Sequence, residues 1–200
     1  MRTLRGKLAL TAAVLVMLGV VGVAEVVAAF RATAQNDGNT FASGTVSLTD
    51  NDDDTAMLSL SAAMPGASDT GCIKVTFDGS LPSTVRLYGT TTGTGLDQYL
   101  DLKVTRGVYS GSEPSFDSCT NFQPDSTNYI GAGNGVVYNG TLEGYPDSYG
   151  SGLSDPTSAS PETWTNGEVH VYKFEVTLQS DVQAEGRNAS QTFTWEAHNQ

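Results

Sequence analysis

Apolar and polar residues alternate in short runs along most of this chain, and this alternation restricts the fold more than any other feature. In residues 72–77 the apolar side chains Ile73, Val75 and Phe77 occupy every second position. The same period of two occurs in five other runs: 45–49, 58–60, 85–87, 100–105 and 192–197. Successive residues of a β-strand point to opposite faces, so this pattern is typical of strands with one buried face. Gly, Pro, Asn or Asp bounds each run, and the sequence therefore predicts an all-β fold, a β-sandwich of jelly-roll or Greek-key type.

The run at residues 168–179 changes parity. Its apolar positions are odd-numbered up to Val171 and even-numbered from Phe174 onward. Because each face of a strand keeps one parity, the change predicts a β-bulge near Tyr172 and Lys173.

Residues 108–165 are rich in Gly, Ser, Pro, Asp and Tyr. We expect long loops there around one strand at 135–142, and long loops in a compact domain are usually functional or mobile. One or two short helical turns are predicted, at 94–99 and around 146–153. The aromatic residues of this segment either form a carbohydrate platform or cover the ends of the sandwich: Tyr129, Tyr138, Tyr145, Tyr149 and Trp164.

The first 28 residues have the order of a secretory signal peptide. Three bases precede the apolar run 8–24, and small or β-branched residues at Val26 and Ala28 suit cleavage between Ala28 and Ala29. Cleavage after Ala24 is the second choice. The alternative is an uncleaved membrane anchor, although such a run spans only about 26 Å of a hydrocarbon core of about 30 Å. We therefore divide the chain into a signal peptide (1–28), an N-terminal segment (29–40) and a β-sandwich domain (41–200).

The chain is acidic. Its formal net charge is −12, and removal of residues 1–28 with three bases and one acid makes it −14. Nucleic-acid binding needs a basic stripe and docking on anionic lipid needs basic residues, so this charge excludes both as partners. Contact with a membrane is expected only through an uncleaved signal segment.

Cys72 and Cys119 are the only cysteines. Export permits a disulfide between them, and closing this loop would stabilise the fold by about 4 kcal/mol on the chain-entropy model. The alternative is a pair of buried free thiols.

No catalytic motif stands out. The sequence contains neither HExxH nor GxSxG, and its cysteines and histidines lack zinc-site spacing. His170, between Val169 and Val171, is expected to face solvent from a strand, and His198 is far from it in sequence. We expect no enzyme activity and no cofactor.

An acidic stretch offers a weak calcium candidate. Asp50, Asp52 and Asp54 alternate in a loop rich in oxygen ligands. Thr55 and Ser61 stand where an EF-hand loop has its glycine and glutamate. The alternative is a solvated turn whose charges protect a sheet edge.

Five short motifs, in order along the chain, resemble the TasA/camelysin family. Ala29-Phe30 matches its Ala-Phe start, and Asn39-Thr40-Phe41-Ala42-Ser43-Gly44-Thr45-Val46-Ser47-Leu48 is similar to its first strand, F-x-A/S-G-T-L-D-L. Met64-Pro65-Gly66-Ala67-Ser68-Asp69 resembles its L-K-P-G-D turn, with methionine in place of lysine. Gly79-Ser80-Leu81 matches its N-G-S-L turn, and Phe193-Thr194-Trp195-Glu196-Ala197 its closing F-x-F-E-A strand. Nothing in 108–165 matches.

The resemblance implies a secreted jelly-roll subunit of fibres in the biofilm matrix or on the cell surface, with other copies of itself and an accessory anchor subunit as partners. In that family the mature N-terminus of one subunit completes the sheet of the next. Here the donor residues would be Ala29, Phe30, Ala32 and Ala34, with Phe30, Ala32 and Ala34 on one face of an extended strand.

Three alternatives to strand donation remain open. The segment 29–40 is either a strand of its own sheet or a disordered tail, and the loops 108–165 are a binding module for carbohydrate or calcium. Camelysin-type relatives carry a metallopeptidase label, which no metal-binding motif of this sequence supports.

Overall fold

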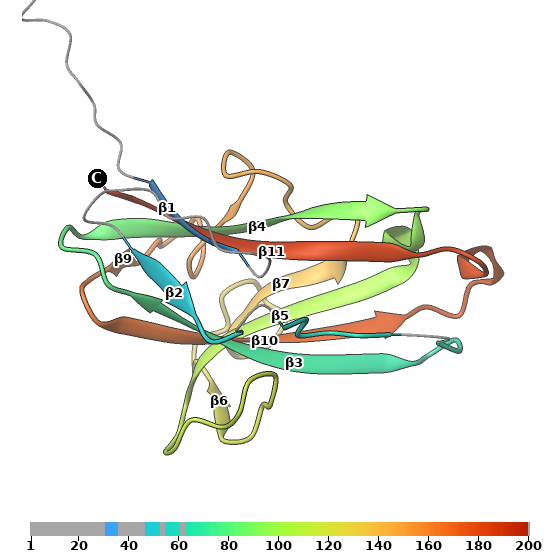
Figure 1. The fold of residues 1–200 in the computed structure, drawn as a ribbon, viewed down its shortest axis with the longest axis horizontal. Coiled ribbons are helices and arrows are strands. Elements are labelled where there is room, and N and C mark those ends of the chain that lie inside the picture. Colours follow the sequence, from blue (N-terminus) through green and yellow to red (C-terminus); the bar gives the residue numbers. More distant parts are fainter. Residues whose placement is uncertain (1–30, 36–46, 53–54, 61–62, 200) are drawn as a thin grey trace, which may run out of the picture.

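The computed structural model describes residues 31–35, 47–52, 55–60 and 63–199. These residues form two antiparallel sheets packed face to face (Figure 1). The predicted β-sandwich is therefore confirmed, while its finer assignment as a jelly roll stays a prediction. The expected signal peptide, with Ala28 and the apolar run 8–24, lies outside the described residues. None of the helices among the described residues is long and apolar enough to span a membrane.

The first sheet has the strand order β1-β11-β4-β8, and β9 also pairs with β4. Its long strands are those with the clearest alternation in the sequence, because every second side chain packs into the core. The strands are β1 (Arg31–Gln35), β4 (Ser83–Gly93), β8 (Leu153–Ser154), β9 (Thr163–Trp164) and β11 (Ala189–Asn199).

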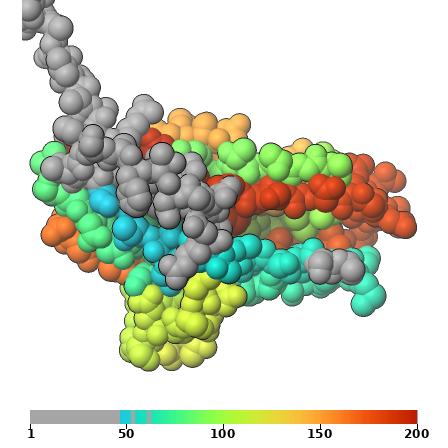
Figure 2. All heavy atoms as spheres, in the orientation of Figure 1, coloured from blue at the N-terminus to red at the C-terminus, as the bar shows by residue number. Residues whose placement is uncertain are grey.

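The second sheet has the order β2-β3-β10-β5-β6, and β7 also pairs with β5. Figure 1 shows β3, β10 and β5 as the layer facing β4 and β11. The strands are β2 (Leu48–Asp50), β3 (Ser68–Phe77), β5 (Leu100–Tyr109), β6 (Phe122–Pro124), β7 (Val136–Thr141) and β10 (Glu168–Leu178). The chain around β6, yellow-green in Figure 2, projects from the body of the sandwich.

The core lies between the sheets and consists of the inward-facing residues of the long strands. Ile73, Val75 and Phe77 of β3 are fully buried. On the facing sheet, Trp195 packs its ring 5.4 Å from that of Tyr172 and 6.1 Å from that of Phe174. Burial of these apolar surfaces is the main favourable contribution to folding.

The predicted bulge in β10 is wrong. This strand pairs with β3 from Glu168 to Thr177 and with β5 from Val171 to Leu178, with no register shift in either ladder. The even-numbered residues face the core throughout, and Val169 is exposed. The prediction assumed that every apolar residue of this run faces the core. Val171 is instead buried on the outer face of the sheet.

Three smaller predictions have different outcomes. The chain at 58–60 forms no strand, and the amide of Ser59 donates to the carboxylate of Asp69. The turn expected at 94–99 is present as the short helix η1 (Leu96–Tyr99), whereas 146–153 contains turns and bends with no helix. A second short helix, η2 (Val182–Ala184), was not expected.

The predicted disulfide between Cys72 and Cys119 is confirmed. It joins β3 to the loop before β6, with the two Cα atoms 5.1 Å apart. The amide of Cys72 also donates to the carbonyl of Asp117 at 3.0 Å. The disulfide therefore fixes the start of the long-loop region against the outer face of the second sheet.

Candidate functional site

A buried polar cluster occupies one end of the space between the sheets. Arg106 of β5 lies opposite Tyr172 of β10, and its side chain points inward in the same parity as Leu102 and Val104. Arg106 is 4 % exposed and His170 is 9 % exposed. The prediction that His170 faces solvent is therefore wrong, because the even parity of β10 extends back to that residue.

The guanidinium of Arg106 binds three carboxylates from two loops: Asp125 follows β6, and Asp155 and Glu162 lie at the two ends of the β8–β9 loop. Its Nε donates to Asp155 Oδ2 at 3.0 Å, and its Nη1 donates to Asp125 Oδ2 at 2.5 Å. Its Nη2 donates to Glu162 Oε2. One buried cation therefore joins the loop after β6 and the β8–β9 loop to the second sheet.

Asp155 is the most completely enclosed acid of the cluster. Trp164 Nε1 donates to its Oδ2 at 2.9 Å, and the hydroxyl of Tyr172 donates to its Oδ1 at 2.8 Å. Burial raises the pKa of Asp155, while Arg106, His170 and these two donors oppose the rise. For Arg106, burial disfavours the charged form, but the carboxylates of Asp155 and Asp125 help to hold its pKa above the usual value.

Two outer groups complete the cluster. The hydroxyl of Tyr129 donates to Asp125 Oδ2 at 2.8 Å, and burial together with this hydrogen bond raises the pKa of Tyr129 to about 12. Glu168 accepts from the amide of Thr165 at 2.8 Å and lies 3.0 Å from His170 Nε2. Burial would raise the pKa of Glu168, but its hydrogen bonds with His170 and Thr165 outweigh burial and lower it.

His170 Nε2 has two competing partners. It lies 2.8 Å from Arg106 Nη2, which can only donate, and 3.0 Å from Glu168 Oε1, which as a carboxylate accepts. Accepting from Arg106 requires an unprotonated Nε2, whereas donating to Glu168 requires a proton there. Nδ1 is buried without a hydrogen-bond partner among the described residues.

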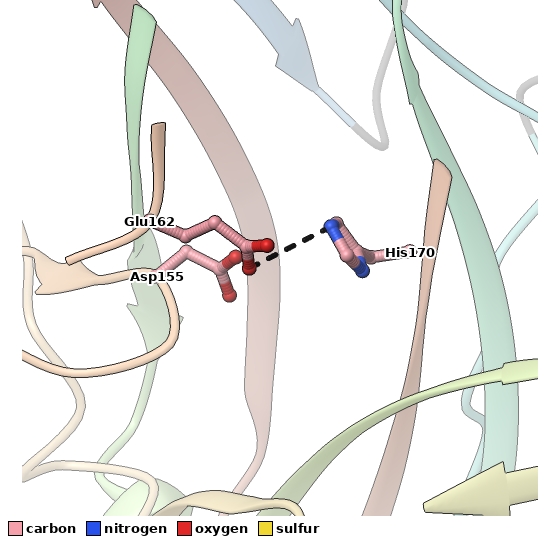
Figure 3. Close-up of side chains that lie close together, drawn as sticks. All are labelled: Asp155, Glu162 and His170. Atoms are coloured by element: carbon pink, nitrogen blue, oxygen red, sulfur yellow. Dashed lines mark ion pairs between the residues drawn. The ribbon is translucent and has the colours of Figure 1, made fainter. Parts of the chain in front are cut away.

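The side chains of Asp155 and Glu162, from the β8–β9 loop, and of His170, from β10, point toward one another (Figure 3). Each offers a ligand atom, and these atoms all lie within 4.8 Å of one another. Two carboxylates and an imidazole form a donor set that binds divalent cations. In this structure Arg106 contacts all three residues, so the centre of the set already holds a positive charge.

The other sequence candidates lie apart from this cluster. Asp50 ends β2, and its Oδ1 accepts from the amide of Asp52 at 3.3 Å, while Asp54 lies outside the described residues. Asp50 and Asp52 belong to no group of three metal ligands in the described part of the chain. The calcium assignment stays untested.

Two of the aromatic loop residues are packed inside the molecule. Trp164 is fully buried beside His170, with 4.6 Å between the ring centroids. Tyr145 is buried and makes edge-to-face contacts with Tyr138 and Phe193. Trp164 and Tyr145 therefore cover the sandwich and do not form an exposed carbohydrate platform.

The N-terminal strand β1 lies at the edge of the first sheet. Figure 1 shows it beside β11, and its five residues pair with Thr194–His198 of that strand in the same chain. This is the intramolecular pairing left open by the sequence, and it includes the backbone of Ala32 and Ala34. Ala29 and Phe30 lie outside the described residues.

The edge of β11 is only partly covered. All of β11 pairs with β4 on one side, but β1 pairs with it only from Thr194 to His198. Within the described parts of the chain, no strand pairs with that edge at residues 189–193. An unpaired edge exposes backbone donors and acceptors that another strand can bind.

Two adjoining apolar cavities lie near this part of the chain, and Ala189, Ser190, Gln191 and Phe193 line the smaller one. One has a volume of about 480 Å³ and the other about 300 Å³, and Leu60, Leu96 and Leu100 line both. Figure 2 shows the red β11 and the teal chain of the β2–β3 connection as the two sides of this region. Val182, which lines the larger cavity, is 82 % exposed. Met64, which lies between the lining residues Ala63 and Pro65, is 77 % exposed.

No model of a known protein family and no curated protein matches this chain. The resemblance to the TasA/camelysin family therefore rests on the sequence motifs alone.

Proposed function

We propose that this protein is exported and polymerises as a structural subunit of extracellular fibres by exchanging its N-terminal strand between copies. The observation that carries the proposal is the position of β1. It is an edge strand, it pairs with β11 only, and it begins three residues after the expected cleavage site at Ala28.

Exchange of such a strand is energetically inexpensive. The hydrogen bonds that β1 makes with its own β11 are the same bonds that it would make with the β11 of a neighbour. The net difference then reduces to the cost of association and any strain in the connection to β2. Because the donor end and the acceptor edge are different surfaces, the contact is heterologous and generates filaments unless the rotation closes a ring.

The free part of the β11 edge supports a longer acceptor site. Residues 189–193 have no strand partner on this side among the described residues, and the smaller cavity is lined by Leu100, Leu102, Val176 and Phe193. In the register that β1 has on its own β11, the residues that follow Gln35 in the donor segment 29–40 would continue along this part of the neighbour's edge.

Deletion of residues 29–34 tests this proposal. We expect the processed wild-type protein to form fibres visible by negative-stain electron microscopy, and the deletion variant to remain monomeric with an intact β-type circular dichroism spectrum. Val108→Ser, which changes an exposed apolar residue outside the β1 pairing, serves as the matched control and should still polymerise. Fibres of normal length from the folded deletion variant would exclude strand exchange.

A further inference from the structure

We propose that the guanidinium of Arg106 occupies the position that a divalent cation would take between Asp155, Glu162 and His170. Removal of this guanidinium would therefore create a zinc site formed by these three side chains. This inference does not depend on the proposed function. It rests on the donor set, on its burial, and on the cation that contacts every member of the set.

The geometry of the three donors is close to what zinc needs. Zinc binds carboxylate oxygen and imidazole nitrogen at about 2.0–2.2 Å, so ligand atoms on one ion lie roughly 3–4 Å apart. The ligand atoms here are within 4.8 Å of one another. The side chain of Glu162 is 40 % exposed, which leaves it free to make the small movement required.

The surroundings hold the remaining donors in place. Trp164 Nε1 and the Tyr172 hydroxyl fix both oxygens of Asp155. Partners of this kind orient metal ligands and sharpen affinity in known sites. Because Asp155 is buried, loss of the guanidinium would leave its carboxylate without a counter-charge, and a bound cation would restore one.

The chemistry of the donors favours zinc over calcium. Calcium takes six to eight oxygen ligands, whereas zinc is satisfied by four ligands that include imidazole. Glu168 Oε1, 3.0 Å from His170 Nε2, or a solvent molecule would supply the fourth ligand. Asp125 lies on the outer side of the guanidinium and adds negative charge that attracts the ion.

The test compares the wild-type protein with Arg106→Ala, using zinc chloride as the probe in isothermal titration calorimetry and thermal unfolding. We expect Arg106→Ala to bind one zinc ion with micromolar or lower Kd, and its Tm to rise with zinc and fall again on chelation. The wild-type Tm should not respond. Cobalt in place of zinc should give the visible absorption of a tetrahedral site in the variant.

Two further variants separate this site from general binding by surface acids. Arg106→Ala combined with His170→Gln should weaken zinc binding at least about tenfold, because an imidazole ligand is removed. Arg86→Ala also removes one arginine, but that guanidinium donates to the backbone carbonyls of Tyr149 and Gly150, and it should gain no zinc response.

Several results would overturn the proposal. A folded Arg106→Ala that binds no zinc at one-to-one stoichiometry contradicts it, as does zinc binding of equal strength by the wild-type protein. If Arg106→Ala is insoluble without metal, the proposal requires recovery of folded protein when it refolds with zinc. Arg106→His is a second variant for the same test. If zinc raises the Tm of neither Arg106→Ala nor Arg106→His, the assignment is overturned.

Discussion

The ion pair of Arg106 and Asp155 is the clearest case in which a single residue organises much of the structure. Their side chains are 5 % and 0 % exposed. A buried pair of this kind contributes little when it is compared with a well-packed apolar pair, but removing one partner leaves a charge stranded in the interior. This one guanidinium binds the loop that carries Asp125 and the loop that carries Asp155 and Glu162, in addition to their backbone hydrogen bonds.

Asp155→Asn should therefore destabilise the fold strongly. The substitution keeps the size of the side chain but removes the charge that faces Arg106, and an amide nitrogen cannot accept from Trp164 or Tyr172. We expect a loss of about 3–5 kcal/mol in the free energy of unfolding, measured by urea denaturation. Asp147→Asn changes an exposed aspartate that accepts only from Ser148 and Ser151, and it should stay within about 0.5 kcal/mol of wild type. Equal stabilities for the two variants would contradict this account of the cluster.

The lowered pKa of Glu168 predicts how stability depends on acid. The carboxylate is favoured in the folded state, so the unfolded chain binds a proton at higher pH than the folded chain does. The stability from Glu168 is therefore complete above the ordinary glutamate pKa of about 4.3 and is lost as the pH falls through the lower folded value. The Tm of Glu168→Gln should lie below that of wild type at pH 7, and the gap should close toward pH 3. A gap that does not change with pH would rule out this electrostatic origin.

At the level of elements, the long strands could be predicted from the sequence because each buries one face. Ile73, Val75 and Phe77 alternate in the sequence and are buried together in β3. The same parity places Arg106 and His170 inside, since Arg106 continues the face of Leu102 and Val104. The even parity of Leu102, Val104 and Arg106 is visible in the sequence. An arginine in an alternating run is, however, usually taken to mark the end of the buried face.

The partners of Arg106 could not be predicted in the same way. Asp125, Asp155 and Glu162 lie in segments with Gly, Ser and Pro and without periodicity, so nothing in the local sequence indicates which way these acids point. Their positions follow from tertiary contacts between β5, β10 and two loops. The short strands β6, β8 and β9 were missed for the same reason, because two or three residues carry no alternation.

The pairing of β5 with β6 depends on a glycine. A Cβ atom at Gly107 would lie 2.1 Å from the carbonyl oxygen of Gln123 and 2.9 Å from the ring of Phe122. Gly107→Ala should therefore cost about 1–3 kcal/mol and lower the Tm. Gly150→Ala, where no atom lies within 4 Å of the new methyl group, is the control and should leave the Tm nearly unchanged. If both variants melt with wild type, the close approach of β6 to β5 is not required for stability.

On the scale of the whole molecule, the two ends of the sandwich differ in chemistry. One end is closed by the charged cluster around Arg106, and the other contains the apolar cavities beside the free edge of β11. The strand β1 covers only the part of β11 from Thr194 to His198. Among the described residues, an edge strand that leaves part of β11 without a strand partner supports the proposed association with copies of the protein.

Cross-linking between two variants that each carry one added cysteine, with the Cys72–Cys119 disulfide intact, tests strand exchange most directly. In the structure Gln35 pairs with Thr194, so one batch of protein carries Gln35→Cys, a second carries Thr194→Cys, and the two are processed, mixed and oxidised. Each copy holds only one partner of the new pair, and the two cysteines are held together when β1 of one copy lies on β11 of another. Mixing Gln35→Cys with Asp101→Cys, an exposed position on β5, gives the background from random collision. Strand exchange predicts disulfide-linked Gln35–Thr194 dimers well above that background, and a yield no greater than the background would show that β1 stays in its own sheet.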